Sequence, residues 1–294
     1  MSNNNTKVWL ITGSSTGFGR ALAEAVLKHG DNPKGLSSAY RLVATARKPE
    51  QLDDLVNQYP ETARAVRLDV TNKTAVKAAV DAAIEAFGRL DVLVNNAGYG
   101  LIGALEEVSD EQIRRNFETN LFGAINMIRA VLPVMRQQKS GHILNMSAIA
   151  GFSNELGFSI YGGAKFAIEG VSEALYGEVA PLGIKVTIVE PGPFRTDFIG
   201  RSLDRAEQSI DEYQQTVGKF LQFLEKIEGT QPGDPDKAAT ALIQVVNSEN
   251  PPLRLVLGKY AYSKFRKKIE SLTAELDAWE QIAAKTDFEK AEAR

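Results

Sequence analysis

The segment Thr12-Gly13-Ser14-Ser15-Thr16-Gly17-Phe18-Gly19 decides how the chain is expected to fold. It follows the apolar run Val8–Ile11 and precedes a helical pattern, Arg20–Lys28, so it connects a strand to a helix. Glycines in such a connection permit a tight turn and a close approach of the backbone to a phosphate, which the free N–H groups of the helix can bind. A glycine-rich turn alone is a weak signal, but its place after the first strand predicts a phosphate-binding loop.

The same segment has a second interpretation. Gly13–Gly17 matches G-x-S-x-G, the nucleophile elbow of α/β hydrolases, which require an acidic residue and then a histidine in later loops. The two histidines are His29, within the first helical pattern, and His142, at the start of a predicted strand. Neither lies in a late loop, so the sequence favours phosphate binding over a serine nucleophile.

Short apolar runs alternate with longer helical stretches, such as Thr74–Phe87, along the chain. The runs predicted to be strands are Val8–Ile11, Leu42–Thr45, Ala65–Leu68, Val92–Val94, His142–Met146, Val186–Val189 and Arg254–Leu257. This alternation indicates an α/β fold with a doubly wound, Rossmann-type and mostly parallel seven-stranded sheet, covered by helices on both faces. Ligands of such sheets bind beyond the carboxyl ends of the strands.

Three segments depart from the alternation. Residues 31–40 are predicted to be an inserted surface loop. Residues 197–230 carry many apolar positions, and we expect them to form a lid over the substrate, although ordinary core helices would have the same pattern. Residues 259–294 are predicted to be a helical extension of a catalytic domain, 1–258, and to dock on the body or on a second subunit.

Composition excludes several kinds of site. The chain of 294 residues has no cysteine and two histidines, so disulfides, thiolate nucleophiles and histidine-rich metal sites are not expected. A net charge of −3 offers no general attraction to nucleic acid. The polar start, Met1–Asn5, does not read as a signal peptide, and no apolar run is long enough to span a bilayer. We therefore expect a cytoplasmic protein that binds no metal.

Tyr161 and Lys165 are the first catalytic candidates. Residues four apart share one face of a helix, so the phenol and the ammonium can point into the same site. A neighbouring cation lowers the pKa of a phenol and makes it a usable acid/base. This spacing often arises by chance, but Ser147 follows a predicted strand and can bond a substrate carbonyl. Asn120 lies in mid-helix, between Glu111 and Val131, where its low helix propensity indicates another role.

Taken together, these motifs resemble those of the short-chain dehydrogenase/reductase family, from Lys7 to about Gly258. Thr12–Gly19 resembles its T-G-x-x-x-G-x-G loop, although Phe18 stands where isoleucine is more usual. Asn95–Gly98 resembles its N-N-A-G motif, and Pro191-Gly192 its P-G turn. The family's Asn-Ser-Tyr-Lys tetrad corresponds to Asn120, Ser147, Tyr161 and Lys165.

The resemblance implies a hydride transfer between a nicotinamide cofactor and a carbonyl or alcohol. Tyr161 would exchange the proton, Ser147 would polarise the substrate oxygen, Lys165 would bond the nicotinamide ribose, and Asn120 would help to hold a relay water. Asp69 would bond the adenine and Thr196 the carboxamide. The implied cofactor cleft consists of Gly13, Ser14, Ser15, Gly17, Phe18, Gly19, Asp69, Val70, Asn96, Ala97, Gly98, Tyr161, Lys165, Pro191, Gly192 and Thr196.

Arg47 and Lys48 indicate which nicotinamide is used. Sites for NAD place an acidic residue after the second strand, where it bonds the ribose 2′-hydroxyl. Ala46 takes that place here, and Arg47, whose planar guanidinium pairs well with phosphate, follows it. Solvated surface cations would give the same sequence, but the pattern favours NADP(H) over NAD(H).

The residues expected at the substrate end are apolar, which favours a lipophilic substrate. They are Tyr99, Phe152, Leu156, Phe158, Phe194 and Phe198. The pattern resembles the branch of the family that includes 17β-hydroxysteroid and retinol dehydrogenases. Two alternatives remain: a non-catalytic NADP(H)-binding sensor, and a lyase or epimerase that also needs Tyr161 and Lys165. By resemblance, we expect a homodimer or homotetramer built through the helices around Asn120 and Tyr161.

Overall fold

The computed structural model describes residues 6–30 and 40–288 of the chain. The predicted insertion at residues 31–40 therefore lies outside the described residues, apart from Tyr40. The strands of the main sheet are β1 (Val8–Ile11), β2 (Arg41–Ala46), β3 (Ala63–Arg67), β4 (Val92–Asn95), β6 (Gly141–Met146), β7 (Ile184–Pro191) and β9 (Arg254–Leu257). Their order is β3-β2-β1-β4-β6-β7-β9, and every neighbouring pair is parallel.

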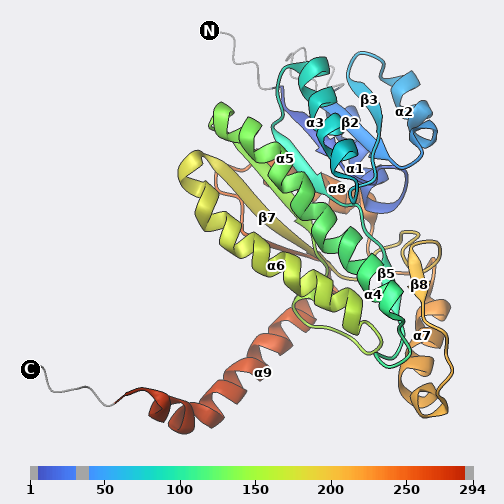
Figure 1. The fold of residues 1–294 in the computed structure, drawn as a ribbon, viewed down its shortest axis with the longest axis vertical. Coiled ribbons are helices and arrows are strands. Elements are labelled where there is room, and N and C mark those ends of the chain that lie inside the picture. The colour runs from blue at the N-terminus through green and yellow to red at the C-terminus, as the bar shows by residue number, and fades with distance from the viewer. Residues whose placement is uncertain (1–5, 31–39, 289–294) are drawn as a thin grey trace, which may run out of the picture.

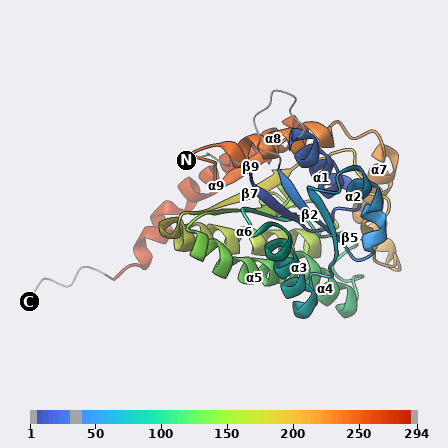
Figure 2. The same cartoon turned by 90° about the horizontal axis from the view of Figure 1, so that it is seen from above.

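The helices cover both faces of this sheet (Figures 1 and 2). They are α1 (Gly17–Gly30), α2 (Asp53–Gln58), α3 (Lys73–Phe87), α4 (Asp110–Phe117), α5 (Gly123–Gln138), α6 (Ser159–Val179), α7 (Lys219–Ile227), α8 (Pro235–Asn247) and α9 (Lys259–Ala283). Buried side chains of α1 and α8 form a core cluster on one face, and those of α3, α5 and α6 form a cluster on the other. The predicted doubly wound α/β fold is confirmed.

Local sequence signals explain where the helices begin and end. The side chain of Asn72 accepts hydrogen bonds from the N–H groups of Thr74 and Ala75 and so caps α3, which ends at Gly88 with φ 74°. Asp234 caps α8 in the same way, with Pro235 in the first turn. Caps of this kind satisfy N–H groups that have no partner within the helix.

A second sheet of two short strands escaped the sequence analysis. β5 (Gly100–Ile102) pairs in parallel with β8 (Leu203–Arg205), about a hundred residues later. Strands of three residues show no usable periodicity, and their pairing depends on contacts remote in sequence. The pair joins the chain after β4 to the segment 197–230 and so holds that segment beside the substrate end of the site.

Helix α9 runs away from the body of the molecule (Figure 1). Ala261 is buried at its start, but the apolar stripe further along is exposed, namely Ile269, Leu272, Leu276, Trp279 and Ile282. The expectation that this stripe docks on the body of the same chain is therefore wrong. The helix leaves the domain surface shortly after Phe265, which stacks on Phe152 with ring centroids 3.8 Å apart.

Candidate active site

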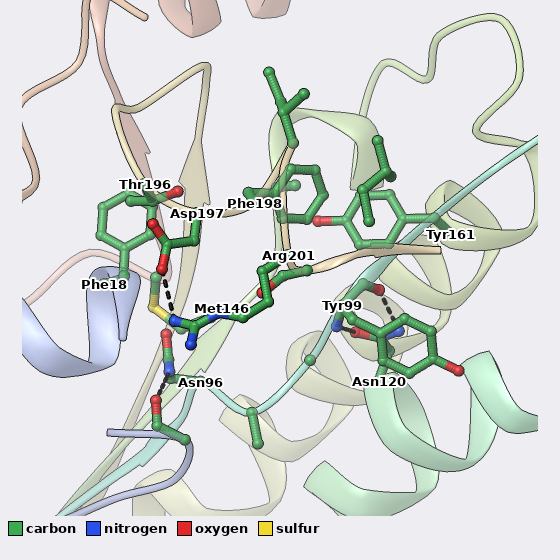
Figure 3. A pocket seen from close by; sticks show the side chains of 18 of the residues that line it. Phe18, Asn96, Tyr99, Asn120, Met146, Tyr161, Thr196, Asp197, Phe198 and Arg201 are labelled. Atoms are coloured by element: carbon green, nitrogen blue, oxygen red, sulfur yellow. Dashed lines mark hydrogen bonds and ion pairs between the residues drawn. The ribbon is translucent and has the colours of Figure 1, made fainter. Parts of the chain in front are cut away.

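A cavity of about 1970 Å³ opens at the carboxyl ends of the strands of the main sheet. Pockets for a single small molecule typically have volumes of roughly 300–1000 Å³, so this one has room for a dinucleotide and a substrate together. Its wall includes all four catalytic candidates, namely Asn120, Ser147, Tyr161 and Lys165. Figure 3 shows Tyr161 and Asn120 reaching the cavity from different helical segments.

Most of the predicted cofactor residues line this cavity. They are Gly13, Ser15, Gly17, Phe18, Arg47, Lys48, Asp69, Val70, Asn96, Ala97, Gly98, Tyr161, Lys165, Pro191, Gly192 and Thr196. Ser14 and Gly19 do not line it. The buried Ser14 hydroxyl donates to the Ile11 carbonyl at 2.9 Å, and a Cβ at Gly19 would overlap the Gly13 carbonyl and the Asn96 side chain. Ser14 and Gly19 therefore shape the glycine loop without lining the cavity.

Asn96 holds the glycine loop in place. Its side-chain amide donates to the carbonyls of Thr12 and Gly13 at 2.9 and 3.0 Å. In return, the Thr12 hydroxyl accepts the N–H groups of Asn96 and Ala97, both at 2.9 Å. The loop itself bends through Gly13 and Gly17, whose positive φ values of 69° and 56° side chains rarely allow. The asparagine motif after β4 therefore sets the shape of the glycine loop.

Tyr161 and Lys165 lie one turn apart on α6, and both are buried. The Lys165 Nζ donates to the Met146 carbonyl at 2.7 Å and lies 5.6 Å from the centroid of the Tyr161 ring. Burial raises the pKa of Tyr161 above its ordinary value. Burial also lowers the pKa of Lys165 to about 8, against the opposing effect of the Glu169 carboxylate. The net shift of the Tyr161 pKa is therefore upward and not downward as expected from the sequence, because desolvation of the phenol dominates.

Asn120 occupies a π-helical turn, Glu118–Phe122, that separates α4 from α5. Its Nδ2 donates to the carbonyls of Tyr99 and Asn116 at 3.0 and 3.1 Å, and its Oδ1 accepts the Tyr99 N–H at 3.3 Å. The predicted continuous helix from Glu111 to Val131 is thus interrupted. Such turns occur often at functional sites, since they redirect a side chain out of the helical register.

Ser147 belongs to a buried charge network that the sequence analysis missed. Its hydroxyl donates to Glu169 Oε1 at 2.5 Å, and Glu169 Oε2 accepts from Arg254 at 2.6 Å. Arg254 also binds Glu190 on β7 and Glu173 on α6, both at 2.6 Å. The available signal was the position of Glu169, one turn after Lys165 on the same helix.

Two basic side chains lie at the end of the cavity beside β2 and β3. Strand β2 ends at the buried Ala46, and the exposed Arg47 and Lys48 follow at the cavity wall. Asp69 and Val70 follow β3, and the Asp69 carboxylate accepts the N–H and hydroxyl of Thr71. The residues present fit a nicotinamide dinucleotide.

The substrate end is built from aromatic residues, with two corrections to the sequence analysis. Tyr99, Phe158, Phe194 and Phe198 line the cavity, but Phe152 and Leu156 do not. Phe152 stacks instead on α9, and Leu156 is 59% exposed. Tertiary packing decides both positions. Segment 197–230 supplies wall residues that the predicted pocket lacked, namely Ile199, Leu203, Phe220, Phe223, Leu224 and Ile227.

Within residues 6–30 and 40–288, no group of three or more His, Asp and Glu side chains is placed to hold a metal ion. Among the same residues, none of the helices has the length and apolar character needed to cross a membrane.

Comparison with known proteins places the chain among oxidoreductases. Oxidoreductase BOA17 of Botryotinia fuckeliana is 43% identical over 279 residues, 95% of this chain and 98% of that protein. The 3-ketodihydrosphingosine reductase of Bacteroides thetaiotaomicron is 37% identical over 262 residues, 89% of this chain and 91% of that protein.

Solved structures agree. A short-chain dehydrogenase from Streptomyces avermitilis matches with a TM-score of 0.88 and 43% identity, covering 96% of this chain and all of the other. A short chain dehydrogenase/reductase from Burkholderia phymatum in complex with NAD (TM-score 0.78, 25% identity) covers 94% of this chain and 97% of its own. ElxO with NADP bound (TM-score 0.70, 26% identity) covers 88% of this chain and 99% of its own.

The sequence model of the short chain dehydrogenase family matches residues 7–207, a span that includes the glycine loop, Asn120, Ser147, Tyr161 and Lys165. Family, fold and relatives together indicate an oxidoreductase that uses a nicotinamide cofactor. The chain belongs to the short-chain dehydrogenase family.

Proposed function

We propose that the protein transfers a hydride between NADP(H) and a lipophilic carbonyl or alcohol, with Tyr161 as the general acid/base. The observation that carries the proposal is that three side chains meet at one cavity. Tyr161, Ser147 and Lys165 come from two elements and reach the wall of one cavity, which also meets the glycine loop. Positioned groups of this kind are what acid/base catalysis requires.

The residues of the chain would divide the work as follows. The nicotinamide, when bound, supplies or accepts the hydride. In reduction, the Tyr161 hydroxyl gives its proton to the substrate oxygen, and burial keeps this phenol protonated near neutral pH. The Lys165 ammonium, over the ring of Tyr161, stabilises the phenolate that remains. Ser147 donates to the substrate oxygen as charge develops on it. Asn120 holds the backbone of Tyr99, which forms part of the wall.

The preference for NADP(H) rests on three consecutive residues. An acidic side chain at Ala46 would repel a 2′-phosphate, and Arg47 and Lys48 can neutralise one. Both cations lie at the cavity wall. We therefore expect the affinity for NADPH to exceed that for NADH.

The substrate proposal rests on the apolar wall and on one relative. Phe158, Phe198, Phe220 and Leu224 surround Tyr161 with aromatic and aliphatic surface, which a long apolar chain or a steroid-sized ring system would bury. A relative that is 37% identical is named for reduction of a sphingoid ketone. We propose a lipophilic ketone as the substrate, with segment 197–230 as its cover.

The test is NADPH oxidation with a panel of aliphatic, aromatic, steroid and long-chain ketones and aldehydes. Tyr161→Phe should lower kcat about 10²- to 10⁴-fold while NADPH still binds. Tyr262→Phe, at an exposed tyrosine outside the cavity wall, is the matched control and should keep full activity. NADPH binding without turnover of any carbonyl would favour the alternative of a non-catalytic sensor, and turnover of substrate without net NADPH consumption would favour a lyase or epimerase.

We propose assembly into a homodimer or homotetramer through the helices around Asn120 and Tyr161. Phe122, Phe166 and Tyr176 are large apolar side chains left exposed on these segments. Burial of such surface between copies is favourable. Sedimentation of the parent and of a Phe166→Glu variant tests this interface, and a monomeric parent would refute it.

A further inference from the structure

The hydroxyl of Ser147 is held by a buried carboxylate. Ser147 Oγ lies 2.5 Å from Glu169 Oε1, and both residues are almost entirely buried. Gly151 faces this pair, and a Cβ there would overlap both the serine oxygen and the carboxylate. The packing therefore leaves the serine oxygen and the carboxylate together in a space that admits no third side chain.

Arg254, the cation that binds Glu169, also binds a second buried carboxylate. Arg254 Nη1 on β9 donates to Glu169 Oε2 and to Glu190 Oε1, each at 2.6 Å. Arg254 Nη2 binds the partly exposed Glu173. Lys165, one turn earlier on α6, also interacts electrostatically with Glu169, and its Nζ donates a hydrogen bond to the Met146 carbonyl. Helix α6 and strands β7 and β9 thus bring three carboxylates to one guanidinium.

Glu190 has the features of an acid that keeps its proton. Its side chain is 0% exposed, and its Oε2 has no hydrogen-bond partner among the described residues. Burial, with the nearby Glu169 charge as the next cause, raises the pKa of Glu190 to about 8. Glu190 therefore keeps its proton near neutral pH, which leaves the Arg254 guanidinium to pair with Glu169.

The bond to Glu169 fixes where the serine hydroxyl lies. A hydroxyl has one proton to donate. In the structure the serine proton points at Glu169 Oε1, and lone pairs of the serine oxygen face the cavity. Glu169 thereby holds the serine oxygen at the cavity wall, and the hydroxyl turns from Glu169 when it donates to a substrate oxygen.

We propose that Glu169, anchored by Arg254, is a positioning residue that fixes the Ser147 hydroxyl at the cavity wall. The inference rests on the proposed function, because it assigns Ser147 the role of a donor to the substrate oxygen. It adds a second residue to that role. No atom is transferred to the substrate from Glu169, which acts only through the hydrogen bond.

Substitutions at Glu169 test the inference through rate. Glu169→Ala should lower kcat about tenfold or more, the effect of losing one hydrogen bond to a charged group. Glu169→Gln should restore most of kcat, because its amide can donate to Ser147 and accept from Arg254. In a Ser147→Ala background, Glu169→Ala should have little further effect, as expected for two residues that act as one unit. Glu173→Gln, which changes another partner of Arg254 without touching Ser147, is the matched control.

Two results would overturn the inference. One is equal slowing by Glu169→Ala with and without Ser147, and the other is a Gln variant as slow as the Ala variant. An inactive parent would instead count against the proposed function, whereas an active parent with either of these results would count against the inference alone.

Discussion

The side chain of Asn120 brackets the backbone of Tyr99, donating to its carbonyl at 3.0 Å and accepting its N–H at 3.3 Å (Figure 3). The amide thereby supplies the partners that a strand neighbour would otherwise give to this stretch of chain, between β4 and β5. The Tyr99 carbonyl also accepts from Asn116 Nδ2 at 3.3 Å, so this part of the cavity wall depends on two asparagine side chains, and the Tyr99 N–H is held by Asn120.

Removal of the Asn120 amide should therefore destabilise the fold as well as the site. Asn120→Ala removes the partner of the Tyr99 N–H and leaves the Tyr99 carbonyl with Asn116 alone, at a cost of about 1–3 kcal/mol in the free energy of unfolding. Urea denaturation measures the change. Asn57→Ala, at an exposed asparagine, should shift the free energy by no more than about 0.5 kcal/mol. Equal shifts in the two variants would show that the bracket adds nothing.

Lys165 should make stability depend on pH in the alkaline range. Burial lowers its pKa from 10.5 to about 8, so between these values the unfolded chain binds a proton that the folded chain has lost. Stability then rises with pH across this window, and the penalty for burying the charge is fully present below it. Relative to Lys165→Met, the parent should gain about 3 kcal/mol across the window. Parallel stability curves for the two proteins would contradict the lowered pKa.

Arg47 should discriminate between the two nicotinamide cofactors. Arg47→Ala should weaken NADPH binding about tenfold to a hundredfold, the loss of a charge-assisted hydrogen bond, and leave NADH binding nearly unchanged. Titration calorimetry with both cofactors gives the two dissociation constants. Arg136→Ala, at an exposed arginine on α5, controls for the general loss of a positive charge. An unaltered NADPH affinity in Arg47→Ala would remove the basis for NADP(H) specificity.

Phe265 should anchor the start of α9. Its ring stacks on Phe152 at 3.8 Å, beside the contacts of Tyr260 and Lys264 with Glu155. Phe265→Ala should lower the free energy of unfolding, and loss of the ring pair should add about 0.5–1.5 kcal/mol to the cost of the lost apolar burial. The substitution should also expose α9 to limited proteolysis. Leu276→Ala, at a position 73% exposed, should change neither. Unchanged proteolysis of Phe265→Ala would show that the other contacts hold the helix alone.

The seven strands of the main sheet were predictable because each is a short apolar run with its own local turn signals. The strands β1 and β9 match the predicted bounds, and the others differ by a few residues at their ends. The pair β5 and β8 was not predictable, since three residues carry no period and the partner lies about a hundred residues away. Glu169 and Arg254 are also remote in sequence, 85 residues apart, so their contact had no local signature either.

The residues of the cavity wall were likewise only partly predictable from the sequence. Phe158 and Phe198 were identified as wall residues, but Phe152 and Leu156, of the same apolar character, lie outside the cavity. Apolar character predicts burial on average and does not say against which partner. Phe152 finds its partner in Phe265, a residue of the tail.

By itself, the sequence determined the α/β class, the phosphate-binding loop and the four catalytic candidates. Each of these is written in local patterns, namely strand–glycine–helix spacing, apolar periodicity and residues four apart on a helix. Tertiary structure alone decided that Glu169, Arg254 and Glu190 meet beneath Ser147, that Asn120 brackets Tyr99, and that burial governs the pKa values of Tyr161 and Lys165. The physical reason is that desolvation and charge pairing depend on which atoms surround a group, and those atoms come from strands and helices remote in sequence.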